Sequence, residues 1–120
     1  MQHAITWFEI PVQNIDRATD FYGTILNTEL NRGEMGGYEM AFFPTTGVGG
    51  ALVQGQGYSP AEHGIVTYLF VGNDVNSVLS RVVQAGGRVL QPKTLITEEI
   101  GYMAFIRDSE GNRIGLHGIG

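Results

Sequence analysis

Glu9 and His117 are the two side chains of this 120-residue sequence that could work together as base and acid. Side chains alternate between the two faces of a strand, and Ile10 and Leu116 mark the apolar, core-facing side of their segments. Glu9 and His117 therefore lie opposite the core. A carboxylate and an imidazole can shift each other's pKa toward neutral pH, so the pair could act as general base and orienting partner. An exposed strand face, or an ion pair between Glu9 and Arg113, explains the same carboxylate equally well.

The other candidate groups have simpler interpretations. His3 lies near the end of the chain and His63 lies in a loop, where we expect solvated or interface positions. Trp7, Tyr38 and Tyr102 could stack on a ligand, although core packing is the commoner reason for an aromatic side chain. The sequence has no cysteine, which excludes disulfides, a thiolate nucleophile and thiolate-bound zinc.

The segments that must position these residues occur twice, about sixty residues apart. A period of that length indicates two fused half-domains, because solenoid repeats are shorter. The two copies share, in the same order, a strand-like run (5–12 and 65–71), a helix-opening motif (14–22 and 74–82) and a Met-Ala-Phe triplet (40–42 and 103–105).

The residue pattern of each copy predicts one strand, followed by one helix and three further strands. Asn14 or Asp16 is expected to cap the first helix, and Asn27 can close it in a left-handed conformation. The second helix carries an apolar stripe formed by Val75, Val78, Leu79, Val82 and Val83. The further strands are predicted near 29–32, 38–43 and 50–54 in the first copy, and near 88–91, 102–106 and 113–118 in the second. The sequence therefore predicts a single α+β domain (1–120) made of two tandem βαβββ modules, at about 1–56 and 64–120.

Composition narrows the class of protein. A chain of this length suits one domain with a continuous core. The net charge of −5 and the lack of a basic run argue against nucleic acid or an anionic membrane as partner. No stretch approaches the roughly 18 apolar residues of a membrane span, and no secretion signal opens the sequence. We expect a cytoplasmic protein.

Two motifs carry a resemblance that covers the whole chain. The first is NIDRATDFY at 14–22, and the second is RDSEGNRIGL at 107–116. With this order of elements, the chain resembles the vicinal oxygen chelate superfamily, which includes glyoxalase I, extradiol dioxygenases and bleomycin resistance proteins. The resemblance implies a glyoxalase-like fold whose sheets enclose a cavity, with the ligand inside it.

The metal-dependent members of that superfamily hold a divalent ion with side chains from the first and last strands of each module, and the metal polarises two adjacent substrate oxygens. In this chain the positions on the two first strands are Trp7 and Thr67, or its neighbour Val66 or Tyr68. The positions on the two last strands are Ala51 or Val53 in the first module and Gly115 in the second. None of these residues is a usual ligand of such a site. We therefore expect no metal and no cofactor.

These inferences predict metal-independent binding of a small molecule, for sequestration or sensing. The expected lining of the cavity is Trp7, Glu9, Thr67, Arg113 and His117. One alternative is a glyoxalase-related enzyme of lyase or isomerase type, in which Glu9 and His117 serve as acid and base or as displaced metal ligands. Another is an interaction module without a ligand, since a fold does not fix a function. A homodimer is expected, because half-domains of this superfamily complete their cavities with a neighbouring half.

Overall fold

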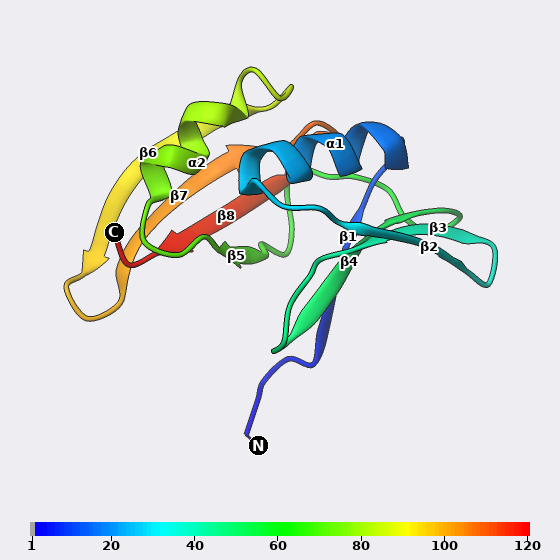
Figure 1. Cartoon of the computed structure of the whole chain (residues 1–120), viewed down its shortest axis with the longest axis horizontal. Helices are drawn as coiled ribbons and strands as arrows, with labels where there is room; N and C mark the ends of the chain where they lie inside the picture. Colours follow the sequence, from blue (N-terminus) through cyan, green and yellow to red (C-terminus); the bar gives the residue numbers. More distant parts are fainter. Residues whose placement is uncertain (1) are drawn as a thin grey trace.

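The computed structural model describes residues 2–120 and contains two four-stranded sheets and two helices (Figure 1). The two halves of the chain have the same order of elements. The first half consists of β1 (Trp7–Pro11), α1 (Ile15–Leu26), β2 (Asn31–Met35), β3 (Tyr38–Phe42) and β4 (Gly49–Gln54). The second half consists of β5 (Tyr68–Phe70), α2 (Val75–Val82), β6 (Arg88–Thr97), β7 (Gly101–Arg107) and β8 (Arg113–Gly118).

Both sheets have the same topology. The strand orders are β1-β4-β3-β2 and β5-β8-β7-β6. The first and last strands of each module run parallel, and the other neighbours run antiparallel. The predicted α+β fold with two tandem βαβββ modules is confirmed.

The helix boundaries follow from local hydrogen bonds. The side chain of Asn14 accepts a hydrogen bond from the backbone of Arg17, and Asn27 ends α1 with φ of 50°. Asp74 caps α2 in the same way. Val83 follows the last residue of α2 and is 68% exposed, so its assignment to the buried stripe was wrong. Neither helix of the described chain, residues 2–120, is long and apolar enough to span a membrane.

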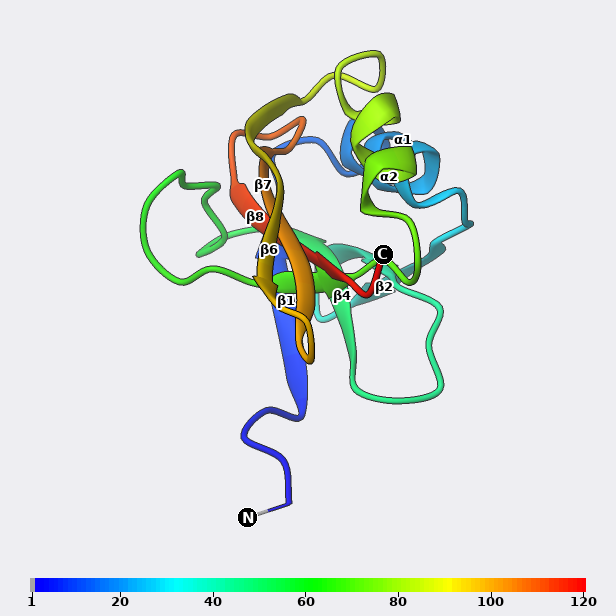
Figure 2. The ribbon, with the colours of Figure 1, turned by 90° about the vertical axis from the view of Figure 1, so that its left-hand side faces the viewer.

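The two helices contact each other and join the modules in one core (Figure 2). The Arg81 guanidinium on α2 donates two hydrogen bonds, of 3.1 and 2.8 Å, to the carbonyl of Ile25 at the end of α1. The strand faces are those that alternation predicted, because Ile10, Val12, Ile114 and Leu116 are all buried in this core.

The β7–β8 hairpin ties the second module to the start of α1. The buried hydroxyl of Tyr22 donates to Asp108 at 2.6 Å, and Asn112 donates to the carbonyl of Pro11 at 2.8 Å. Glu110 accepts hydrogen bonds from the backbone of residues 13 and 14 and from Arg17. The hairpin therefore closes the N-terminal end of α1, where backbone N–H groups need acceptors.

Candidate functional site

Two hollows lie between the modules. The smaller one, of about 300 Å³, is bordered by β1, by the segment between the modules and by the start of β8. Three of the five residues expected to bind a ligand line it, namely Glu9, Thr67 and Arg113. His63 and Asn112 line the same hollow. Residues far apart in the sequence thus meet at one place on the surface.

Glu9 is an exposed carboxylate held by two aromatic donors. The Trp7 indole donates to Oε2 at 3.3 Å, and the Tyr58 hydroxyl donates to Oε1 at 2.5 Å. The hydrogen bond to Glu9 is the main reason that the pKa of Tyr58 is raised. The ring of Tyr38 meets that of Tyr58 edge to face at 5.4 Å, which fixes the position of the tyrosine. Glu9 is thereby oriented on the wall of the hollow, with lone pairs left to accept further hydrogen bonds.

Arg113 forms a cationic part of this wall. Its guanidinium lies over the ring of Phe105, 4.1 Å from the ring centroid. Within residues 2–120 Arg113 forms no ion pair with a carboxylate. Of the two simple interpretations of Glu9, the exposed strand face is therefore the one that the structure has, and the ion pair with Arg113 is absent from it.

His117 lies apart from this hollow. Its Nε2 atom is 2.6 Å from the carbonyl oxygen of Ile100, and its ring packs against Phe70 with centroids 5.7 Å apart. In the described chain it forms no hydrogen bond with Glu9. Trp7 lies beside the hollow through its hydrogen bond to Glu9, and its ring is 6.1 Å from that of Phe42.

Strand register identifies the residues equivalent to the family's metal ligands on the first strands. Val12 and Val71 each donate a backbone hydrogen bond to the last strand of their own sheet, at 2.9 and 2.8 Å. Trp7 lies five residues before Val12, and Val66 lies five residues before Val71. Trp7 and Val66 are therefore equivalent positions in the two modules. Neither residue can bind a metal.

A tyrosine ring covers the position on the last strand of the second module. Gly115 pairs with Tyr68, and a Cβ atom added at Gly115 would come within 2.5 Å of the Tyr68 ring. In the first module the candidate positions, Ala51 and Val53, carry buried apolar side chains. In residues 2–120 no three His, Asp or Glu side chains lie close enough together to hold a metal. The residues present do not fit the family's metal centre.

Tyr58 is the site residue that sequence reasoning missed. It lies in the segment between the modules, where no strand or helix period assigns a side chain to a face. The only signal is its type, an aromatic side chain in a stretch otherwise rich in glycine and polar residues.

The match to a family agrees with this architecture. The model of the Glyoxalase/Bleomycin resistance protein/Dioxygenase superfamily matches residues 4–116, so the chain belongs to this superfamily. A search of curated proteins finds no match.

Several solved structures have the same fold. A glyoxalase/bleomycin resistance protein from Albidiferax ferrireducens T118 aligns with a TM-score of 0.73 at 15% identity, over 97% of this chain and 98% of that one. A hypothetical protein from S. aureus aligns with a TM-score of 0.72 at 21% identity, over 97% and 94% of the two chains. A glyoxylase/bleomycin resistance protein/dioxygenase domain from Frankia sp. EAN1pec aligns with a TM-score of 0.73 at 17% identity, over 97% of this chain and 91% of that one. At these identities the similarity shows the fold alone.

Proposed function

We propose that this glyoxalase-superfamily protein binds a small molecule without a metal ion, for sequestration or sensing. The observation that carries the proposal is that Glu9, Thr67 and Arg113, which come from both modules, line one hollow of about 300 Å³. That volume lies at the lower end of the range for small-molecule sites. The residues at the family's ligand positions, above all Trp7 and Gly115, support metal independence because neither offers a metal-binding side chain.

The charges on the wall indicate the polar groups that a ligand would carry. Arg113 can donate to an anionic or carbonyl group while its guanidinium stays over Phe105. Glu9 can accept from a hydroxyl or an amine, and the neighbouring Trp7 ring offers an aromatic contact. His117 is on the same face of β8 as Arg113, four residues or about 13 Å along the strand, so it would contact only an extended ligand.

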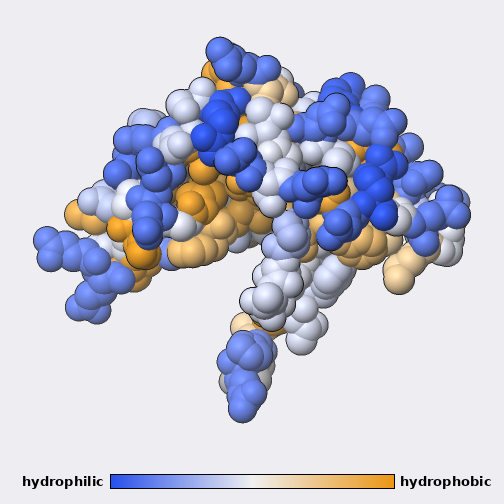
Figure 3. Space-filling model, viewed as in Figure 1, coloured by the Kyte–Doolittle hydropathy of each residue, from blue (hydrophilic) through white to orange (hydrophobic). Residues whose placement is uncertain are grey.

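We also propose a homodimer, because apolar side chains are exposed on the second module. Phe70 is 65% exposed, and Tyr68 and Leu95 are about half exposed. Figure 3 shows hydrophobic surface in the recess below the helices, over the region of β5 and β8. Exposed apolar side chains of this size are common on association surfaces.

A thermal-shift screen of small polar aromatic compounds, run in the presence of a chelator, tests the proposal. The best hit is then titrated by calorimetry into the wild type, Glu9→Gln and Arg113→Gln. Each substitution removes a charge that would hydrogen-bond to the ligand, so we expect affinity to fall by about tenfold or more.

The matched control is Arg88→Gln, at an exposed position at the start of β6 that lies outside the hollow. It should bind as the wild type does. If both site variants keep the wild-type affinity, the hollow is not the binding site and the proposal fails.

A further inference from the structure

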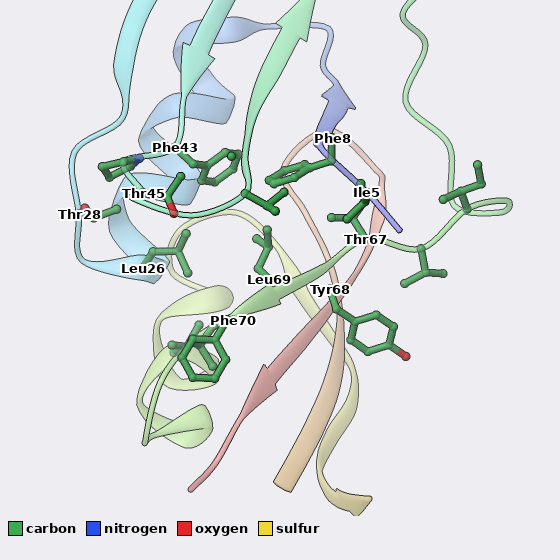
Figure 4. A pocket seen from close by; sticks show the side chains of 17 residues that line it. Ile5, Phe8, Leu26, Thr28, Phe43, Thr45, Thr67, Tyr68, Leu69 and Phe70 are labelled. Carbon is green, nitrogen blue, oxygen red and sulfur yellow. The ribbon is translucent and has the colours of Figure 1, made fainter. Parts of the chain in front are cut away.

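The larger hollow between the modules has a different character from the polar one. Its volume is about 770 Å³, within the range of ligand cavities. It lies below the C-terminal end of α1, between the first module and β5 (Figure 4). We propose that this cavity is a second binding site, which takes a neutral and mainly apolar small molecule.

The walls of the cavity are apolar and come from three layers of the fold. Phe8 and Phe43 of the first module lie together on one side, with ring centroids 5.5 Å apart. Leu26 and Val78 contribute from the two helices, and Leu69 from β5. Aliphatic and aromatic walls of this kind bind apolar ligands by removing their surface from water.

Hydroxyl groups, and no charged side chains, supply the polarity of the lining. Thr28, Thr45 and Thr67 border the cavity, and among residues 2–120 no Asp, Glu, Lys, Arg or His side chain does. Thr45 Oγ1 accepts a hydrogen bond from the backbone of Gly47, so its hydroxyl hydrogen remains free to donate. A charged ligand would lose its hydration without gaining a counter-charge, which selects neutral molecules.

The open edge of β5 adds backbone groups. The carbonyl of Thr67 accepts a hydrogen bond from the backbone N–H of Gly115, and the backbone N–H of Val71 donates one to the carbonyl of His117. Thr67 and Val71 therefore both form their backbone hydrogen bonds with β8. Alternate residues of a parallel strand bond to the same neighbour, and the amide groups of Tyr68 and Phe70 therefore point to the free edge of the sheet. Both residues line the cavity. A ligand with one hydrogen-bonding group, such as an amide or a ketone, can be anchored there.

The cavity can be tested with N-phenyl-1-naphthylamine, a neutral aromatic probe whose fluorescence rises in apolar surroundings. We expect saturable binding at one site per chain. Leu26→Trp fills the cavity from the end of α1, and it should weaken binding by about tenfold or more. Met35→Trp places the same ring on β2, at an exposed position outside the cavity, and should leave affinity within about twofold of the wild type.

A second filling variant, Val48→Trp in the loop before β4, covers the case in which Leu26→Trp does not fold. Thermal melting of each variant verifies the fold.

The anionic analogue 8-anilinonaphthalene-1-sulfonate should compete poorly for the site because, among residues 2–120, no cationic side chain lines it. No saturable binding to the wild type, or equal binding to the folded filling variants, would overturn the proposal. The polar hollow is tested with Glu9→Gln and Arg113→Gln, and this cavity with Leu26→Trp and Val48→Trp, so failure of the one site and failure of the other are distinguishable.

Discussion

Glu110 is the carboxylate with the most hydrogen-bond donors around it, and it lies at the junction of the modules rather than in the candidate site. Its side chain is shielded from solvent, at 0% exposure, and contacts Arg17 at 2.7 Å. Burial alone would raise its pKa. Hydrogen bonds from Arg17, from the backbone of Asn14, from Ser109 and from the backbone of Gln13 outweigh that effect and lower the pKa to about 2.

This lowered pKa predicts how stability depends on pH. The stabilisation from ionised Glu110 is fully present above its unfolded pKa of about 4.3, and it is lost as the pH falls toward about 2. Glu110→Gln should therefore lower the free energy of unfolding by about 1–3 kcal/mol at pH 7. The difference from the wild type should shrink below pH 4.

Urea unfolding of both proteins at pH 7 and pH 3 measures this effect. Glu98→Gln, in the exposed turn before β7, is the matched control and should change little at either pH. A destabilisation of Glu110→Gln that is equally large at both pH values would show that the charge is not what stabilises the hairpin.

At the scale of elements, local chemistry predicted the helices and the strand faces. Asn14 and Asp74 cap the helices because their side-chain oxygens accept from the first turn, and this depends only on neighbouring residues. The alternation of side chains along a strand also depends only on neighbouring residues, and it assigned Ile10 and Leu116 correctly to the core.

Boundaries that depend on tertiary packing were less accurate. The sequence predicted a strand near 88–91, whereas β6 continues to Thr97. Pro92 favours an end to a strand, but β6 is an edge strand, and its pairing with β7 shifts register between Gln91 and Thr94. The shift accommodates the proline, and a bulge of this kind depends on the partner strand.

The candidate site could be predicted only in part for a similar reason. Strand parity identified Glu9 and Arg113 as residues facing away from the core. Which of them meet depends on how the modules pack, and that packing brings Arg113 into one hollow with Glu9 while His117 contacts Ile100. The alternation of side chains along a strand gives no information about Tyr58, because the segment that contains it is not a strand.

At the scale of the whole molecule, the exposed apolar side chains of the second module predict self-association. Light scattering at micromolar concentration should give the mass of a dimer. Phe70→Asp places a charge on this surface and should shift the protein toward the monomer, because an unpaired charge is costly to bury. Met35→Asp makes an equivalent change on β2 of the first module and should remain dimeric. A monomer mass for the wild type would contradict the proposed dimer.

We propose that this member of the superfamily works without a metal ion. Elemental analysis of protein purified without an affinity tag tests this proposal. Trp7 and Val66 stand at the first-strand positions, and the Tyr68 ring covers Gly115, so we predict far less than one equivalent of Zn, Ni, Fe or Mn per chain after dialysis. About one equivalent of any of these metals per chain, retained after dialysis, would contradict the account.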